Sequence, residues 1–295
     1  DGAAQPPMRP TTALRRLRIV LEMIKFEHTL FALPFALMGM LLAAGGVPEG
    51  RIVLWIVVAM VGARSAAMGW NRLVDREIDA ANPRTAMRAL PAGLVTPGFV
   101  AAFVLASLAL LVIAAWRLNP LCLALSPVAI FVLLGYSYTK RFTWAAHLAL
   151  GLALAGAPLG AWIAVTGSFS ATPFVLAGVV VTWVAGFDIL YALQDREFDQ
   201  TAGLHSVPQR FGVRTALLIS RLAHLVTMTC LFWLYALLPV GMTYLLGVLI
   251  ALGLIVYEHS LVKEHDLSKL NIAFFNMNGY ISVTIFLFTL LDVLL

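Results

Sequence analysis

A long apolar run ends in a polar stretch that reads Asn71-Arg72-Leu73-Val74-Asp75-Arg76-Glu77-Ile78-Asp79. Asn71, Asp75 and Asp79 recur at every fourth residue, and on an α-helix this spacing places them along one face, about 6 Å apart. Packing in lipid does not call for two acids on one face, because their charges repel each other. The pattern returns after another apolar run as Asp195-Arg196-Glu197-Phe198-Asp199. A function for this chain must therefore account for two acidic motifs at the ends of two hydrophobic segments.

The composition is that of an integral membrane protein. Charged residues make up 12% of the 295 residues and hydrophobic residues 61%, whereas a soluble protein has about 25% charged residues. Apolar segments of about 20 residues cross a bilayer as helices, because a helix satisfies its own backbone hydrogen bonds. The two cysteines both lie in apolar runs, which argues against a disulfide scaffold or a cysteine-rich metal site. We expect an all-α, polytopic membrane protein.

Nine hydrophobic segments are long enough to be transmembrane helices. They are residues 27–45, 52–70, 98–116, 120–138, 144–165, 173–193, 214–235, 240–257 and 272–294. Residues 1–25 are basic and predict a disordered tip followed by a short amphipathic helix on an anionic membrane surface. The recurring acidic motif suggests a single domain with pseudo-repeat halves of about 26–142 and 143–295. Polar loops at 80–97 and 196–214 follow the two motifs.

The positions of Lys and Arg predict the orientation. Outside the spans they lie in the N-terminal tail and in the loops after the second, fourth, sixth and eighth spans, and only Arg51 and Arg117 lie on the other side. Cytoplasmic loops carry the excess of positive charge. We therefore expect a protein of the cytoplasmic (inner) membrane whose N-terminus and acidic motifs face the cytoplasm and whose C-terminus faces outward.

The carboxylates suit a metal–diphosphate site. Asp75, Asp79, Asp195 and Asp199 would together carry about four negative charges, which two Mg²⁺ would neutralise, and Mg²⁺ prefers oxygen ligands and leaves coordination positions for substrate phosphates. Bound metals would draw charge onto the leaving oxygens. Basic residues expected on the same side suit the same anion; they are Lys140, Arg141, Arg76 and Arg84. A diphosphate attached to a lipid would place its head at the metals and its tail among the helices.

Several residues inside the spans allow two interpretations. Arg64 would either pair with a core acid such as Asp188 or hold the carboxylate of an acceptor molecule. Tyr138, Phe187 and Tyr191 are aromatic residues that fit core packing or the shielding of an allylic cation by their π faces.

A secondary transporter is the alternative from another functional class. Its halves and midplane polar residues would suit the repeat, but its acids should then lie within the spans rather than at their ends. His28 is expected to be a polar residue at the entrance of the first span, not a catalytic base.

The motifs resemble those of the UbiA superfamily of intramembrane prenyltransferases. The resemblance rests on Asn71-x-x-x-Asp75-x-x-x-Asp79 and Tyr191-x-x-x-Asp195-x-x-x-Asp199, and extends through Asn82-Pro83-Arg84-Thr85, Leu90-Pro91-Ala92-Gly93 and Tyr138-Thr139-Lys140-Arg141. It implies a ring of nine helices around a central cavity capped by cytoplasmic loops. It also implies Mg²⁺ held by the Asp pairs with help from Asn71, and diphosphate bound by Lys140 and Arg141, with Arg76 as a further candidate.

Within the superfamily the chain is most similar to 4-hydroxybenzoate polyprenyltransferases and to relatives that prenylate 1,4-dihydroxy-6-naphthoate on the futalosine route to menaquinone. The resemblance implies transfer of a polyprenyl group from polyprenyl diphosphate to an aromatic acid, 4-hydroxybenzoate first and the naphthoate as the alternative. The segment 25–35 resembles both groups equally, and Arg72 stands where many ubiquinone-pathway members carry Asp. A haem, chlorophyll or tocopherol prenyltransferase is a further alternative. Neither nucleic acid nor an obligate protein partner is expected.

Overall fold

The computed structural model of the protein describes residues 12–24 and 29–295. His28 and most of the N-terminal tip therefore lie outside the described residues. The helices are α1 (Ala13–Met23), α2 (Thr29–Ala44), α3 (Gly50–Val74), α4 (Arg76–Ala81), α5 (Pro97–Leu118), α6 (Pro120–Thr139), α7 (Ala146–Thr166), α8 (Thr172–Ala192), α9 (Arg196–Ala202), α10 (Val207–Leu237), α11 (Met242–Leu261) and α12 (Asn278–Leu294). A 3₁₀ turn links α8 to α9, and a π-helical turn precedes α12.

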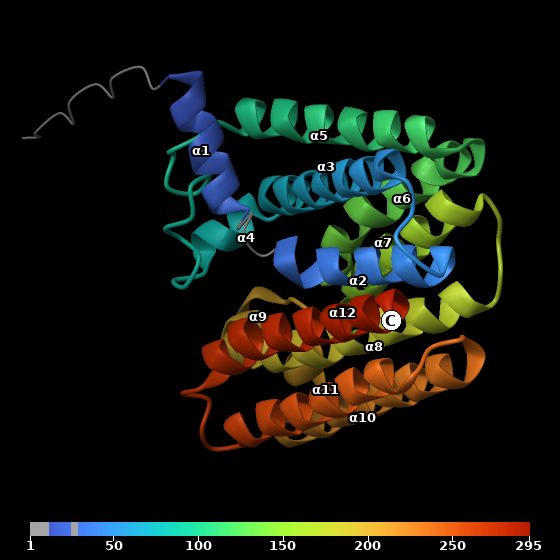
Figure 1. Ribbon diagram of the computed structural model, residues 1–295. Helices are drawn as coiled ribbons and strands as arrows, with labels where there is room; N and C mark the ends of the chain where they lie inside the picture. The colour runs from blue at the N-terminus through green and yellow to red at the C-terminus, as the bar shows by residue number, and fades with distance from the viewer. Residues whose placement is uncertain (1–11, 25–28) are drawn as a thin grey trace, which may run out of the picture.

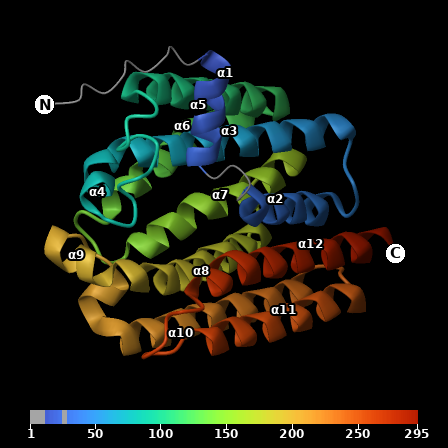
Figure 2. The same cartoon turned by 90° about the vertical axis from the view of Figure 1, so that its left-hand side faces the viewer.

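The long helices form a closed ring (Figures 1 and 2). In the described part of the chain, neighbours pack side by side in the order α2, α3, α5, α6, α7, α8, α10, α11, α12, and α12 returns to α2. Eight of these helices are long and apolar enough to cross a membrane, whereas the described apolar part of α2, Ala32–Ala44, is shorter. The all-α, polytopic fold is confirmed, and the exact number of nine spans is not established.

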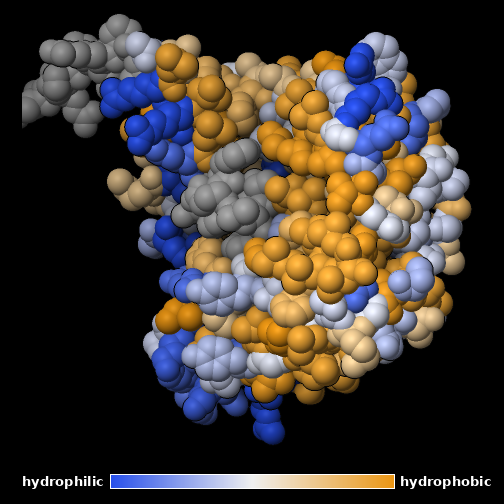
Figure 3. Space-filling model, viewed as in Figure 1, coloured by the Kyte–Doolittle hydropathy of each residue, from blue (hydrophilic) through white to orange (hydrophobic). Residues whose placement is uncertain are grey.

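The surface of the ring suits lipid. Large hydrophobic side chains such as Leu105, Phe131 and Trp233 are exposed on its outside, and Figure 3 shows a broad hydrophobic face between hydrophilic residues at the end where α1 lies and a second hydrophilic group at the opposite end. The core between the helices is mainly aliphatic and includes aromatic residues such as Phe35 and Trp183, whose ring centroids are 4.9 Å apart. The chain is an integral membrane protein.

The two segments that follow the acidic motifs lie at one end of the ring, opposite the C-terminus (Figures 1 and 2). The prediction of a loop over residues 196–214 is wrong for most of its length, because α9 and the start of α10 occupy it. Gly203 ends α9 in a left-handed conformation (φ 66°), and Ser206 caps α10 by accepting a hydrogen bond from Gln209 N. The polar residues of this segment therefore lie in α9 and in the first turns of α10, which cover one end of the ring.

The first cap, residues 82–96, is braced by α1. Val20 and Met23 of α1 and the following Ile24 pack in one cluster with Leu90 and Val95 of the cap. The expected short amphipathic helix is therefore present, and protein covers the apolar side chains at its C-terminal end, whereas Leu14 and Leu17 are exposed. Its contact with an anionic membrane surface stays a prediction.

Close contact between α7 and α8 depends on a residue without a side chain. A Cβ atom added to Gly151 would lie 2.5 Å from the carbonyl oxygen of Val181. We expect Gly151→Ala to lower the free energy of unfolding by about 1–3 kcal/mol, because overpacking displaces backbone. Gly156 on the same helix has nothing within 4 Å of an added Cβ, so Gly156→Ala is the matched control. Thermal unfolding in detergent measures both, and an equal loss in the two variants would contradict the prediction.

Candidate active site

Both acidic motifs interrupt a long helix at the same kind of position. Asp75 lies between α3 and α4 (φ −92°, ψ 4°), and Asp195 is the last residue of the 3₁₀ turn, directly before α9 (φ −98°, ψ 0°). This sparsely populated backbone region recurs at active sites. The helical hydrogen bonds continue across the first break, from Asp75 N to Asn71 O and from Asp79 N to Asp75 O. The predicted common face is kept between Asn71 and Asp75, whose side chains are 3.1 Å apart (Nδ2 to Oδ2).

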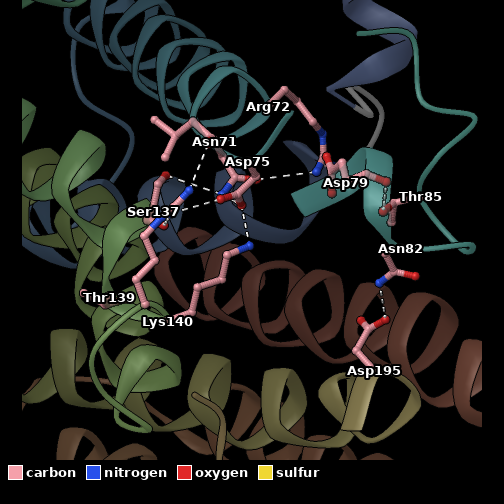
Figure 4. A network of polar contacts seen from close by, with 12 residues as sticks. Asn71, Arg72, Asp75, Asp79, Asn82, Thr85, Ser137, Thr139, Lys140 and Asp195 are labelled. Atoms are coloured by element: carbon pink, nitrogen blue, oxygen red, sulfur yellow. Dashed lines mark hydrogen bonds and ion pairs between the residues drawn. The ribbon is translucent and has the colours of Figure 1, made fainter. Parts of the chain in front are cut away.

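Asp75 is buried against two basic residues from the end of α6 (Figure 4). Lys140 Nζ donates to Asp75 Oδ2, and an Arg141 nitrogen donates to Oδ1 at 3.2 Å. Arg141 also donates to the Val74 carbonyl oxygen at 2.9 Å, so it ties the end of α6 to the end of α3. The charge repulsion expected within the motif is thus relieved by cations from another helix.

Asp79 is held by the first cap. Arg88 donates to Asp79 Oδ1 at 2.7 Å, and the Thr85 hydroxyl donates to the Asp79 carbonyl oxygen at 2.9 Å. Asp79 Oδ2 is buried and has no hydrogen-bond partner among the described residues. Buried carboxylate oxygens are normally paired, so this oxygen marks a position for a ligand.

Asp195 accepts three side-chain hydrogen bonds from Arg84 and Asn82. Arg84 forms a two-pronged contact, from Nε to Oδ1 at 2.9 Å and from its terminal nitrogen to Oδ2 at 2.6 Å. Asn82 Nδ2 also donates to Oδ1 at 3.1 Å (Figure 4), while its own Oδ1 accepts from Arg84 N and turns the chain. Burial lowers the pKa of Arg84, but the hydrogen bonds and charge of Asp195 outweigh it and raise the pKa above its ordinary value. Arg84 is therefore a permanent cation.

The second cap, residues 196–214, is tied to the same site by its own contacts. Ser206, which caps α10, donates its hydroxyl to Asp199 Oδ2 at 2.9 Å. The backbone N–H of His205 donates to the Lys140 carbonyl oxygen at 2.7 Å. One short segment thereby positions Asp199 and the residue that contacts Asp75.

These side chains surround a cavity of about 430 Å³. Most of its charged lining comes from the cap end of the helices, and Arg64 and Asp188 lie deeper. Its apolar lining comes from the middles of α3 and α7 and includes Met60, Ala63, Leu150, Leu154 and Ala157. One cavity therefore joins a charged chamber to a hydrophobic one.

Most of the residues expected from the sequence line this cavity. Those that do are Arg64, Asn71, Asp75, Asp79, Arg84, Lys140, Phe187, Asp188, Tyr191, Asp195 and Asp199. Three others do not line it. Arg141 acts through Asp75, Arg76 is exposed and pairs with Glu77 at 3.4 Å, and Tyr138 is exposed beneath the Arg141 guanidinium.

An aromatic wall lines one side of the cavity. Tyr191 stacks on Phe274 with ring centroids 4.0 Å apart, and Phe187 meets Phe274 edge to face at 5.4 Å. The Arg84 guanidinium lies 5.6 Å from the centre of the Tyr191 ring. The expected pair Phe187 and Tyr191 thus belongs to one cluster, at the boundary between the charged and apolar parts.

Sequence reasoning missed four residues of the site. Asn82 and Arg88 belong to the first cap, and their sequence signal was the polar run that contains Asn82-Pro83-Arg84-Thr85. His147, which lines the cavity and contacts Asp188, lies alone in an apolar segment and gave no signal. Ser206 did have a signal in the sequence, because Ser206-Val207-Pro208 is typical of a helix start with Ser as the cap and Pro in the first turn.

The residues present fit Mg²⁺ by their chemistry. Among the residues that the structure describes, no three His, Cys, Asp or Glu side chains are close enough together to hold a metal, and the motif acids contact cations or Ser206 instead. Yet both motifs offer hard oxygen ligands to one cavity, and the unpaired Asp79 Oδ2 is such an oxygen.

Two relatives are similar to the chain over most of its length. A 4-hydroxybenzoate octaprenyltransferase of Vibrio cholerae is 34% identical over 252 residues, which cover 84% of this chain and 87% of that protein. A protein of the same name from Saccharophagus degradans is 30% identical over 254 residues, which cover 86% and 84%.

Solved structures of UbiA homologs are also similar to this chain. The apo structure of a UbiA homolog from Aeropyrum pernix K1 superposes with a TM-score of 0.83 at 30% identity, covering 90% of this chain and 98% of that one. A UbiA homolog from Archaeoglobus fulgidus bound to GPP and Mg²⁺ shares the fold, with a TM-score of 0.72 at 18% identity over 94% of this chain and 100% of that one. A model of the UbiA prenyltransferase family matches residues 32–280. The chain belongs to the UbiA prenyltransferase family.

Proposed function

We propose that this protein transfers a polyprenyl group from a polyprenyl diphosphate to 4-hydroxybenzoate, in a Mg²⁺-dependent reaction that leads to ubiquinone. The observation that carries the proposal is the single cavity with charged groups at the cap end and apolar walls further in. A prenyl diphosphate has the same two parts, a charged head and a hydrocarbon tail. The two relatives described above are named for this acceptor.

The diphosphate head would lie among the cations of the caps and of α6. Lys140, Arg84 and Arg88 all line the cavity, and each now contacts a motif carboxylate. Charged nitrogen donors bind phosphate oxygens strongly, so these residues can exchange a carboxylate for the diphosphate. Arg141 would assist through Asp75, and diphosphate binding by the exposed Arg76 stays a prediction.

Mg²⁺ would be held by Asp75 and Asp79 on one side and by Asp195 and Asp199 on the other, with Asn71 as a further ligand. Bound there, two ions would neutralise the departing diphosphate and so promote its loss. The proposal is supported by the oxygen donors and the unpaired Asp79 Oδ2.

The apolar part of the cavity would hold the prenyl chain and protect its cation. Tyr191 and Phe187 line the cavity, and aromatic rings of this kind can stabilise a nearby positive charge. The hydrophobic walls and the two caps exclude water, which would otherwise consume the allylic cation. The protein thus contributes positioning and charge stabilisation.

The acceptor would bind through its carboxylate to Arg64. Arg64 lies two helical turns before Asn71 on α3 and lines the cavity, so it lies deeper than the diphosphate site. An acid held there presents the ring carbon beside its hydroxyl to the cation. That carbon forms the new bond, the ring proton leaves, and the diphosphate is released.

The site would face the cytoplasm. Both caps and α1, which carries Arg15, Arg16 and Arg18, lie at the end of the ring opposite the C-terminus (Figure 1). The excess of Lys and Arg at that end supports a cytoplasmic N-terminus in the inner membrane.

The direct test is an assay of purified protein in detergent with Mg²⁺, geranyl diphosphate and either 4-hydroxybenzoate or 1,4-dihydroxy-6-naphthoate, with products identified by mass spectrometry. We expect prenylated 4-hydroxybenzoate. EDTA should reduce product formation to background and added Mg²⁺ should restore it, while the unfolding temperature changes little, because the motif acids keep their ion pairs without metal. Product formation that persists in EDTA would refute the metal dependence.

If product forms from the naphthoate alone, we would assign the protein to menaquinone synthesis, and the proposed metal site would be unaffected. The half-buried Arg72, which donates to Asn71 Oδ1 at 3.4 Å, is the residue that keeps this alternative in the test. No product and no diphosphate release from any acceptor would refute the proposed function. Family membership already argues against the transporter.

A further inference from the structure

A second acidic feature of the cavity lies below the two motifs. Asp188 is on α8, two turns before Asp195, and Arg64 is on α3, two turns before Asn71. Two helical turns correspond to about 10 Å. Both residues line the same cavity, so a cation and a carboxylate lie at about the same depth beneath the diphosphate site.

The carboxylate of Asp188 is held by a buried histidine. His147 Nδ1 and Asp188 Oδ2 are 2.7 Å apart, and the backbone N–H of Val207 donates to His147 Nε2 at 3.2 Å. Because Nε2 accepts this bond, the ring proton is on Nδ1 and is donated to Asp188. His147 is therefore neutral, and Asp188 is an acceptor, as an ionised carboxylate is.

The position of Val207 explains why this tautomer is fixed. Val207 is the first residue of α10, and the N–H groups of a first helical turn have no partner within the helix. The second cap, which holds Asp199 through Ser206, therefore also orients His147. The His147 side chain is 6% exposed, whereas that of Asp188 is 25% exposed and lines the cavity.

We propose that Asp188 accepts the proton of the acceptor's hydroxyl group during prenylation and that His147 positions it. This inference rests on the proposed function. A phenol with a carboxylate at the opposite end of its ring would place the carboxylate at Arg64 and the hydroxyl at Asp188. A phenolate is a far better carbon nucleophile than a phenol, so a base at the hydroxyl accelerates attack by the ring.

The step balances in protons and electrons. The ring carbon beside the hydroxyl uses an electron pair to bond to the prenyl carbon, whose bond to the diphosphate oxygen breaks. The hydroxyl proton passes to Asp188, so the ring becomes a neutral dienone. The hydrogen on the substituted carbon then leaves as a proton to the departing diphosphate, and Asp188 returns its proton to the oxygen. The ring is aromatic again and Asp188 is ionised again.

The test uses Asp188→Asn, whose amide oxygen still accepts the His147 proton but cannot take up a proton itself. With 4-hydroxybenzoate we expect kcat to fall by about 10²-fold or more, which is typical of a lost general base, while KM for geranyl diphosphate changes less than about threefold. With 3-fluoro-4-hydroxybenzoate, whose hydroxyl is a stronger acid and needs less help, the loss should shrink at least severalfold. A merely structural role would give equal losses with both acceptors.

Asp292→Asn is the matched control. Asp292 on α12 accepts hydrogen bonds from the N–H groups of Gly241 and Tyr244 at the other end of the ring, and its replacement should leave kcat unchanged with both acceptors. His147→Gln, which keeps a donor, should retain more activity than His147→Leu. Wild-type kcat in Asp188→Asn, or an equal loss with both acceptors, would overturn the inference while the proposed function stands. A wild-type protein that prenylates no phenol would overturn both.

Discussion

Replacement of Asp195 by Asn is expected to reduce kcat by about 10³-fold or more while the protein keeps its fold. Asp195 accepts hydrogen bonds from Arg84 and Asn82 and would hold Mg²⁺. Loss of its charge would therefore remove several kcal/mol of stabilisation from the departing diphosphate. About 4 kcal/mol corresponds to about 10³ in rate. An Asn oxygen can still accept from Arg84, so the unfolding temperature should change little. Product formation at saturating Mg²⁺ and geranyl diphosphate measures the effect.

Glu77→Gln is the control for Asp195→Asn. Glu77 belongs to the first motif and its side chain is 86% exposed, so the same loss of one charge should change kcat less than about twofold. Wild-type activity in Asp195→Asn would refute the assignment of the second motif to the metal site. A comparable loss in Glu77→Gln would show that kcat depends on the net charge of the protein and not on the position of the acid.

The second large effect is expected from Arg84→Lys. Lysine keeps the charge but cannot make the two parallel contacts to Asp195 or reach Tyr191 in the same geometry. We expect KM for geranyl diphosphate to rise about tenfold and kcat to fall about 10²-fold, as for the loss of one preorganised donor in an oxyanion site. Steady-state kinetics with varied geranyl diphosphate separates the two effects.

Arg51→Lys is the matched control for Arg84→Lys. Arg51 is exposed at the far end of α3, so this variant should behave as wild type. If Arg84→Lys also retains wild-type KM and kcat, the two-pronged contact has no role in diphosphate binding.

The membrane helices were predictable because the thickness of a bilayer fixes their length. Expected segments such as 98–116 and 173–193 agree closely with α5 and α8. The second cap was not predictable in the same way. Its residues are polar because they cover a charged chamber, and polar composition without a hydrophobic face does not distinguish a short helix from a loop. Gly203 and Gly212, with φ of 66° and 80°, are the residues that shape it.

The motif acids were predictable because spacing on a helix is a local property. Their partners were not, because contacts between distant segments depend on how the ring closes. Asn82 and Asp195 are 113 residues apart, and His147 and Asp188 are 41 apart.

Arg76 and Arg88 show how nearness in sequence misleads. Arg76 follows Asp75 directly, but successive helical side chains point about 100° apart, so Arg76 turns outward to Glu77. Arg88 is nine residues from Asp79, and the first cap folds back and brings the two together.

The ion pairs of Asp75, Asp79 and Asp195 have a thermodynamic consequence. A divalent cation bound by one of these carboxylates would release Lys140, Arg88 or Arg84 for an anion, and an anion bound by the basic residue would release the carboxylate. Each ligand would therefore raise the affinity of the other, and by linkage the factor would be the same in both directions. A lone cation or a lone phosphate would have to break an ion pair without replacing it, so we expect the two ligands to bind together more tightly than either alone.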